Sequence, residues 1–424
     1  MLDLLVVGGG AAGFYGAIHT VRQCPGARVL ILEQNKQFLS KVRISGGGRC
    51  NVTHRPMEPD QLARHYPRGE RELLGPFHRH ASQDTMMFFQ ELGVPLKIEV
   101  DGRVFPQSNS SESIIEALIT EATALGIKIK TGCKVTHFSP IDTQNSGWNI
   151  ETGAHQYHAR NLLICPGSSQ AMWKQLAVLG LQMVSPVPSL FTFRILDPRL
   201  TGLQGVSAAA QISVLGMPVA SKKGKGAQKL TATGPVLITH WGLSGPAVLR
   251  LSAWGARHFA DCEYRFEVVV NWLPEYSSDE VSTRLTKIRN QESKKLVSAS
   301  RAIDLPVRLW KQLVTAAAIG QEVQWAQLTA VQLNELCVQL TGSVFKVTGK
   351  STFKEEFVTA GGVSLKEINF KTFESKKHHG LFLAGEVLDI DAITGGFNFQ
   401  NAWTGSFLAA TGIVQNLIHQ ESPR

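Results

Sequence analysis

The sequence predicts an α/β protein in which a discontinuous Rossmann-like dinucleotide-binding domain is interrupted by an inserted domain that is β-rich and then helical. Three observations lead to this fold class. An apolar strand followed by a glycine turn opens the chain, a second strand, glycine loop and helix close it, and the strand–helix alternation stops between about residues 189 and 343. With 424 residues, 43% of them hydrophobic, the chain can build more than one core.

The first element is an apolar run at residues 2–7 (LDLLVV), followed by the glycine-rich sequence GGGAAG and a helical pattern. In such a turn Gly8 permits a sharp bend, Gly10 lets the backbone approach a pyrophosphate, and Gly13 lets the helix lie close to the strand. Residues 28–32 (RVLIL) predict the second strand, and Glu33 follows Gly13 at about the 20 residues expected of a ribose-binding acid. An acid there favours a free 2′-hydroxyl, as in FAD or NAD, over the 2′-phosphate of NADP.

A second glycine cluster occupies residues 45–53 (SGGGRCNVT) and has no apolar periodicity, which predicts a loop. Its successive glycines, Gly47 among them, let the backbone pass close to a flat or charged group, and Arg49, Asn51 and Thr53 supply hydrogen-bond donors. The alternative is a flexible surface loop without a ligand.

The third cluster is C-terminal. An apolar strand at residues 381–384 precedes GEVLDID at 385–391 and TGGFNFQ at 394–400, and an apolar helix is expected from about Asn401. The N-terminus of this helix suits an electron-rich group, and Glu386 is placed to bond a polyol chain.

Between these parts, alternating residues such as 208–215 predict short antiparallel strands. Ser277 or Ser278 is expected to cap a helix that runs to about residue 290, and Thr329 another that runs to residue 340. We therefore expect a first domain at residues 1–188 and 345–424, and an insert at 189–344 that is β-rich over 189–275 and helical over 276–342.

The charge of the chain raises the odds of a polyanionic partner, because 43 Lys and Arg stand against 34 Asp and Glu, for a net charge of +9. The clearest cluster lies in a predicted glycine-rich hairpin tip and comprises Lys222, Lys223, Lys225 and Lys229. Residues 277–311 carry a further excess of basic side chains. Solvated loops and ordinary charged helix faces are the alternative for both segments.

The sequence contains no run of about 18 uncharged apolar residues and no basic region ahead of its first apolar stretch, so we expect neither a membrane span nor a secretory signal and place the protein in the cytoplasm. The six cysteines are scattered without a C-x-x-C pair, and we expect neither a structural metal site nor a disulfide framework.

Five motifs in order resemble the BaiN/RdsA-like family of FAD-dependent oxidoreductases over nearly the whole chain: GGGAAG, KVRISGGGRCNVTH, THWGLSGPAVL, TAGGVSLKEI and LFLAGEVLDIDAITGGFNFQNAW. The resemblance implies an extended FAD, with its adenosine at the N-terminal glycines and its isoalloxazine near the C-terminal ones. The sequence departs from the family pattern at residues 165–168 (CPGS instead of ATGG), at Arg43 and at Ala392.

Position by position, the resemblance implies that the pyrophosphate and adenosine are held by Gly8, Gly10, Ala12, Gly13, Glu33 and Val135. Val135 lies in a strand that we expect over residues 127–137. It implies that the flavin side is held by Lys41, Gly47, Arg49, Asn51, Gly167, Gly385, Glu386, Gly396, Asn398 and Gln400.

The activity that the resemblance implies is reduction of an activated C=C bond, in steroid enones or in uridine of large-subunit ribosomal RNA to give dihydrouridine. No second G-x-G-x-x-G follows a strand, so NAD(P)H would visit the flavin transiently as the electron donor. The basic insert favours RNA as the substrate. A small-molecule enone reductase or amine oxidase, and a non-catalytic FAD-containing RNA or ribosome interaction protein, are the alternatives.

Cys50 is the candidate proton donor, because a thiol in a glycine-rich loop near the flavin could protonate a carbanion. A small packed residue is the alternative for this cysteine. Asp389 and Asp391 are the other candidate donors, against loop solvation or a helix cap.

Overall fold

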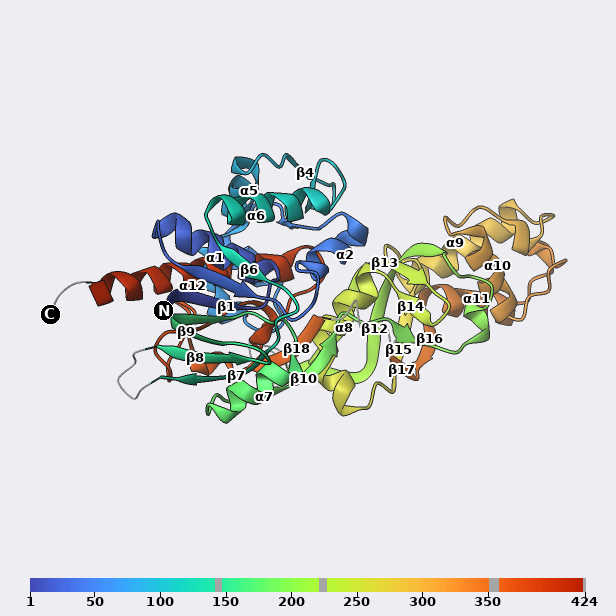
Figure 1. Ribbon diagram of the computed structural model, residues 1–424. Helices are drawn as coiled ribbons and strands as arrows, with labels where there is room; N and C mark the ends of the chain where they lie inside the picture. Colours follow the sequence, from blue (N-terminus) through green and yellow to red (C-terminus); the bar gives the residue numbers. More distant parts are fainter. Residues whose placement is uncertain (142–146, 221–226, 351–357, 422–424) are drawn as a thin grey trace. The chain divides into compact units, whose positions relative to one another are not determined.

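The chain forms two compact units in a computed structural model that describes residues 1–141, 147–220, 227–350 and 358–421 (Figure 1). The first unit combines residues 1–186 with 358–424, and the second consists of residues 187–357. Each unit has its own sheet and core.

The first unit is built on five parallel strands in the order β21 (Leu381–Leu383), β9 (Gln156–Ile164), β1 (Leu2–Val7), β2 (Val29–Leu32) and β6 (Lys128–Lys130). Nearly every side chain of β1 and β2 is buried, which is why their sequences are continuously apolar instead of alternating. Helices α1 (Ala11–Gln23) and α12 (Phe397–Glu421) pack against each other beside this sheet (Figure 1).

Antiparallel strands extend the parallel core of the first unit. They are β7 (Val135–Pro140), β8 (Trp148–Thr152), β19 (Ile368–Asn369) and β20 (Glu374–Ser375). A separate three-stranded sheet is formed by β3 (Thr53–His54), β5 (Arg103–Pro106) and β4 (Leu96–Ile98), and a two-stranded one by β10 (Met183–Ser189) and β18 (Val358–Val363). The remaining helices are α2 (Ser40–Gly48), α3 (Pro59–Ala63), α4 (Glu70–Phe77), α5 (Ser82–Glu91), α6 (Glu112–Ala124) and α7 (Gln170–Val178).

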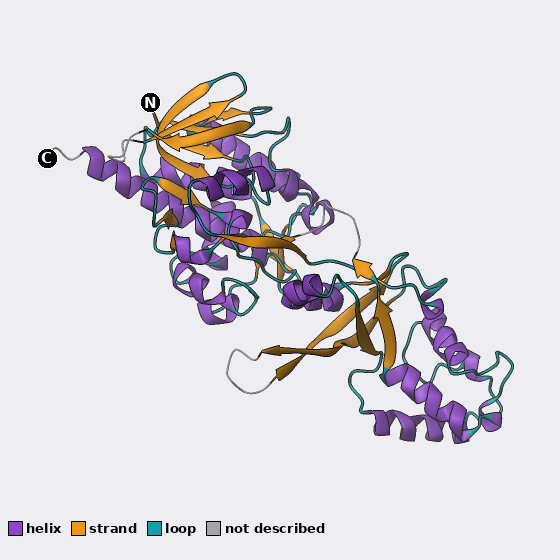
Figure 2. Cartoon of the chain, turned by 90° about the horizontal axis from the view of Figure 1, so that it is seen from below, coloured by secondary structure: helices purple, strands orange, loops and turns teal. Residues whose placement is uncertain are grey.

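The second unit contains a seven-stranded sheet and a group of helices beside it (Figure 2). The order of the strands is β16 (Ser343–Val347), β15 (Phe266–Asn271), β12 (Ser207–Ala220), β13 (Ala227–Ile238), β14 (Gly242–Ser244), β11 (Phe193–Arg194) and β17 (Gly349–Lys350). The helices are α8 (Pro246–Asp261), α9 (Ser278–Gln291), α10 (Val307–Ala316) and α11 (Ala330–Thr341). The α/β fold class that the sequence predicts is confirmed by the parallel sheet of the first unit and the β-rich, then helical, second unit.

The two helices expected in the insert begin at their predicted caps. The Ser277 hydroxyl accepts a hydrogen bond from the Glu280 N–H at 3.3 Å, and the Thr329 hydroxyl one from the Gln332 N–H at 3.2 Å. Both are capping boxes, in which the side chain three residues on bonds back to the cap. These predictions are confirmed.

Three local expectations differ from the structure. The run at residues 127–137 is two strands, because β6 pairs with β2 while β7 turns to pair with β8. Part of the segment 40–48 is helical, although Ser45, Gly46 and Gly47 break the helix. Strands β16 and β17, which we expected in the first domain beyond residue 344, pair in the sheet of the second unit.

Candidate dinucleotide-binding site

The carboxyl ends of four parallel strands carry the residues that the sequence analysis singled out. Strand β1 ends at the glycine turn, β2 at Glu33, β9 at residues 165–168, and β21 at Gly385. The neighbours of β1 are β2 on one side and β9 on the other, so the chain order reverses there. Open α/β sheets bind ligands at such a switch point.

The glycine turn after β1 has the stereochemistry that a pyrophosphate site needs. Gly8 has a φ of +109°, and a Cβ added there would lie 2.4 Å from the Cys165 carbonyl oxygen. A Cβ on Gly13 would lie 2.0 Å from the Gly8 oxygen, so only glycine lets α1 approach β1 this closely. Gly10 is different, since a Cβ there would meet nothing within 4 Å.

The N-terminus of α1 lies at this open position. Gly10 is its N-cap, no side chain caps it, and no acidic residue occupies its first turn. The first N–H groups of a helix lack intrahelical partners and carry partial positive charge. An anion is therefore the ligand that this helix end fits.

Glu33 lies beside the same turn and is 8% exposed. Its Oε2 accepts the Gly9 N–H at 2.8 Å, and its Oε1 accepts the backbone N–H and side-chain amide of Asn35, both at 2.8 Å. A carboxylate oxygen has room for two donors, so Oε2 can still accept a ribose hydroxyl. The structure thus brings the predicted ribose acid to the predicted pyrophosphate turn.

Val135 begins β7 and is buried, 4% exposed. The preceding segment runs beside Glu33, because the Cys133 N–H donates to the Glu33 carbonyl at 2.8 Å. The adenine contact predicted for the Val135 backbone stays a prediction.

Lys41, Gly167 and Glu386 come together from three distant parts of the chain. Lys41 Nζ forms an ion pair with Glu386 Oε2. A Cβ on Gly167 would lie 3.7 Å from that oxygen and 3.8 Å from Nζ. The other Glu386 oxygen accepts the Thr359 N–H at 2.9 Å.

Gly385 and Ala12 also meet, since a Cβ on Gly385 would lie 3.5 Å from the Ala12 Cβ. The C-terminal motif therefore lies directly beside the first turn of α1. Gly385 has a φ of +78°, a conformation that L side chains rarely adopt.

The second glycine cluster presents bare backbone. Gly46, Gly47 and Gly48 all have positive φ, and a Cβ on Gly47 or Gly48 would meet nothing within 4 Å. The Arg49 guanidinium lies over the Phe105 ring, 4.0 Å from its centroid, and pairs with Glu99 at 2.7 Å. The Arg49 side chain thus has partners within the protein, and its predicted cofactor contact stays a prediction.

Cys50 is fully buried with a φ of +58°, and burial raises the pKa of its thiol to about 12. A proton donor has to reach the atom that it protonates. In this conformation the thiol is packed inside the protein. Its role as donor stays a prediction that a substitution can test.

Polar side chains from the second and third clusters join around Gly396. With its amide oriented so that the oxygen faces Gly396, Asn51 accepts that N–H at 2.9 Å and donates to the Thr53 carbonyl at 2.9 Å. Asn398 exchanges two hydrogen bonds with the backbone of Ala392, at 3.0 and 3.2 Å.

Gln400 is fully buried beneath these residues. It accepts the Thr53 hydroxyl at 2.6 Å and donates to Thr404 at 3.0 Å. Asn51, Asn398 and Gln400 thus have protein partners that shape the turn, and their cofactor contacts stay predictions.

Of the alternative proton donors, Asp391 is fully buried and forms a bidentate ion pair with Arg68. The ion pair engages both carboxylate oxygens, and the role of Asp391 as an alternative proton donor stays a prediction. The sequence analysis missed Arg68, because no motif or spacing links residues so far apart. Asp389 has its N–H bonded to the Val363 carbonyl at 3.0 Å.

The predicted RNA-contacting lysines cannot be placed in the same way. Lys222, Lys223 and Lys225 lie outside the described residues, and Lys229 is described only by its backbone in β13.

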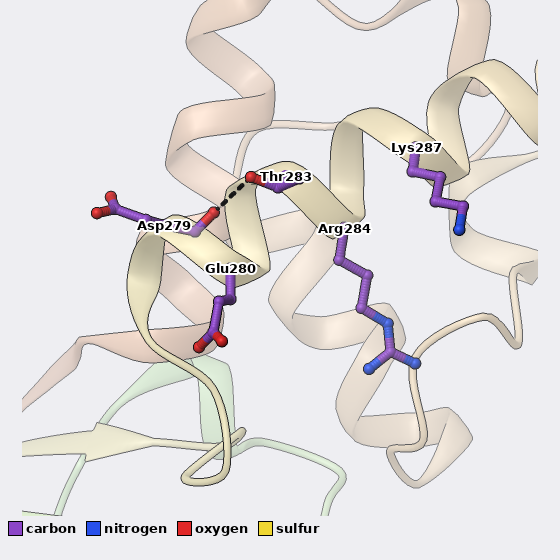
Figure 3. A pocket seen from close by; sticks show the side chains of 5 residues that line it. All are labelled: Asp279, Glu280, Thr283, Arg284 and Lys287. Atoms are coloured by element: carbon purple, nitrogen blue, oxygen red, sulfur yellow. Dashed lines mark hydrogen bonds between the residues drawn. The ribbon is translucent and has the colours of Figure 1, made fainter.

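An open hollow of about 350 Å³ lies on the second unit and is lined by Asp279, Glu280, Thr283, Arg284 and Lys287 (Figure 3). All five residues belong to successive turns of α9, and the Thr283 hydroxyl donates to the Asp279 carbonyl at 2.9 Å. This hollow is one surface of a single helix with charges of both signs.

Within the described residues, no helix is both long and apolar enough to cross a membrane. The same part of the chain holds no group of three or more His, Cys, Asp or Glu side chains that could bind a metal ion.

A parallel sheet with this strand order, a glycine turn at its switch point and an acid after the second strand define a Rossmann-type dinucleotide-binding protein. The family model described as "HI0933-like protein Rossmann domain" matches residues 2–412, and the chain belongs to this family. The family resemblance seen in the motifs is confirmed.

Several relatives match over nearly their full length, and two of them are described here by name. One, a "3-dehydro-bile acid delta(4,6)-reductase" of Clostridium scindens, is 28% identical over 426 residues, covering 97% of this chain and 98% of the relative. The other, a "Ribosomal RNA dihydrouridine synthase" of Haemophilus influenzae, is 27% identical over 420 residues, covering 96% and 98%. A solved 3-ketosteroid-delta4-(5alpha)-dehydrogenase from Rhodococcus jostii aligns over 98% of this chain and 96% of its own, at 12% identity and a TM-score of 0.49. At that level the likeness carries no information on ligand or activity.

Proposed function

We propose that this chain binds FAD and reduces an activated C=C bond with electrons from NAD(P)H. The observation that carries the proposal is that the glycine turn, Glu33, Gly167 and Gly385 follow the carboxyl ends of four neighbouring parallel strands in a member of this family. Both full-length relatives have names that describe reductive chemistry on an unsaturated substrate.

The residues present fit FAD. The uncapped N-terminus of α1 and the open space at Gly10 suit the pyrophosphate, and Glu33 suits the adenosine ribose. Lys41 and Glu386 would face the ribityl chain, and the bare backbone of Gly47 would adjoin the ring. When bound, FAD supplies hydride transfer between the nicotinamide donor and the substrate.

For the substrate we propose uridine in large-subunit ribosomal RNA. The two relatives are about equally similar to this chain, so identity does not choose between a steroid and an RNA. The net charge of +9 favours the polyanion, since Lys and Arg contacts to phosphates dominate nucleic-acid affinity. Uracil and an enone share a C=C bond conjugated to a carbonyl, so one chemistry serves both.

Two other functions make different predictions. A small-molecule enone reductase or amine oxidase would turn over without RNA. A non-catalytic FAD-containing RNA or ribosome interaction protein would hold FAD that NAD(P)H does not reduce. Stopped-flow absorbance of the FAD-loaded protein mixed with NADH or NADPH separates the enzymes from the third function.

The test of the substrate is mass mapping of modified uridines in ribosomal RNA from a strain that lacks this protein. We expect one dihydrouridine to disappear and to return with the wild-type chain but not with a Gly10→Val variant. An unchanged dihydrouridine map, together with rapid reduction of a 3-keto-4-ene steroid by the purified protein, would favour the small-molecule enzyme.

A further inference from the structure

The turn at residues 390–397 connects β21 to α12 and carries Gly395 and Gly396. We call it the cofactor turn. Gly396 has a φ of +89°, and a Cβ there would lie 2.4 Å from the Thr53 carbonyl oxygen. Its N–H bonds to Asn51 of the second glycine cluster. Two proposed flavin-side segments therefore meet at this turn.

A segment far away in sequence, residues 65–69 between α3 and α4, lies along the cofactor turn. We call this segment the strap. The His65 carbonyl accepts the Ile393 N–H at 3.1 Å, and the His65 ring stacks on Phe397 with centroids 4.2 Å apart. The buried Tyr66 hydroxyl donates to the Phe397 carbonyl at 2.6 Å.

An ion pair also joins the strap to the cofactor turn. Arg68 Nε and Nη2 donate to the two oxygens of Asp391, and the two residues also form a β-bridge. The Asp391 side chain is 0% exposed and that of Arg68 is 14% exposed. Next to this pair, a Cβ on Gly69 would lie 2.9 Å from Ile390 Cγ1, so the Ile390 side chain packs against the Gly69 backbone as closely as glycine allows.

We infer that Arg68 is a positioning residue for the cofactor, acting through Asp391 to hold the cofactor turn in its binding shape before FAD arrives. This inference rests on the proposed binding of FAD. Removing Arg68 takes the bidentate hydrogen bonds from a carboxylate that is 0% exposed, and weakening the interactions of a buried charge destabilises the segment that carries it. FAD would then have to order the cofactor turn as it binds. The free energy needed for this ordering is subtracted from the binding free energy, so the affinity for FAD falls.

The experiment is titration of the apo-protein with FAD, followed by flavin fluorescence, well below the unfolding temperature of each variant. We expect Arg68→Gln and Asp391→Asn each to raise the Kd for FAD about tenfold or more. The double variant Arg68→Leu/Asp391→Leu should raise the Kd less than the two single changes combined, because both single changes remove the same interaction.

The chain offers a matched control. Arg64 and Asp60 form a 2.8 Å pair in and beside α3, but their side chains are 70% and 54% exposed. Exposed pairs contribute little, so Arg64→Gln should bind FAD with the wild-type Kd. Each variant is also melted without FAD, because a pair that serves only the fold would lower the melting temperature and leave the Kd unchanged.

A wild-type Kd in Arg68→Gln would overturn the inference. If that variant does not fold, Arg68→Lys, which keeps the charge but not the bidentate geometry, carries the test, with a several-fold rise in Kd expected and a wild-type Kd overturning the inference. Failure of the wild-type apo-protein to bind FAD would instead contradict the proposed function.

Discussion

The sharpest prediction compares two glycines of the same turn, Gly10 and Gly13, which the structure places in opposite surroundings. Gly10 has ordinary extended angles, φ −95° and ψ −168°, and open space where a Cβ would lie. Gly10→Val should therefore cost the apo-protein only about 1 kcal/mol, the difference between glycine and a β-branched residue at an N-cap. The valine would nonetheless occupy the space proposed for the pyrophosphate.

Gly13 is enclosed. A Cβ there would lie 2.0 Å from the Gly8 oxygen, against an ordinary contact of 3.4–4 Å, so α1 has to move away from β1. Overpacking of this kind costs about 1–3 kcal/mol and is offset only in part by the better helix propensity of alanine. Gly13→Ala should therefore lower the melting temperature of the apo-protein by several degrees.

The assay measures the FAD released on denaturation of each purified variant and the melting temperature of its apo-form. We expect Gly10→Val to lower the melting temperature less than Gly13→Ala does and yet to lose FAD, with the Kd at least 100-fold higher, or about 2.7 kcal/mol. Stoichiometric FAD retained by Gly10→Val would show that this turn does not hold the pyrophosphate.

Three further predictions follow from the site and the core. Cys50→Ala should slow the reoxidation of FAD by substrate about 10²- to 10⁴-fold and leave the reduction of FAD by NAD(P)H near the wild-type rate; wild-type rates in both half-reactions would show that this buried thiol only packs. Replacing four lysines of the insert with Gln (Lys222, Lys223, Lys225 and Lys229) should weaken RNA binding. A plot of log K against log salt concentration should become shallower by up to about 0.7–0.9 per lost phosphate contact. An unchanged affinity and slope would show that these lysines only make the surface soluble. Burial lowers the pKa of His80 to about 4 and that of His19 well below its usual value. Both side chains are neutral in the folded protein and bind a proton in the unfolded chain below about pH 6.5. The free energy of unfolding should therefore be constant above about pH 6.5 and should fall by on the order of 3 kcal/mol toward pH 4 from His80 alone. Urea unfolding at pH 7 and pH 4.5 measures this, with the exposed His155→Gln as control, and a flat profile would refute it.

The glycine turn and its acid could be predicted because their chemistry is local. Gly8, Gly13 and Glu33 lie within one strand–helix–strand unit, where spacing along the chain fixes position in space. The continuous apolar runs of β1 and β2 likewise predict strands that are buried on both faces of the sheet.

Contacts between distant segments carry no such signal. The Lys41–Glu386 pair could be anticipated only as two residues on the same side of a ligand, and Arg68–Asp391 not at all. Strand β16 follows a helix and has an ordinary alternating pattern, so only its pairing with β15 reveals that it belongs to the second unit. The solvent exposure of a side chain also cannot be predicted from the sequence. The glycine-rich loop around Cys50 suggests an accessible thiol, but the structure buries it.

The pairing of β21 with β9 has a consequence for synthesis of the protein. On the ribosome, β9 emerges about 200 residues before its partner, and α12 follows later still. Until then one edge of the parallel sheet and the faces of α1 that α12 covers stay open to water, which favours association with other chains or with chaperones. The second unit, by contrast, is one continuous stretch of chain and can fold before the C-terminal part of the first unit has been made. Because Glu386 and Gly396 are made long after Gly10, the proposed cofactor site can be complete only once the segment that carries them has emerged and paired, and the supply of free FAD should influence how much of the newly made chain reaches its native state.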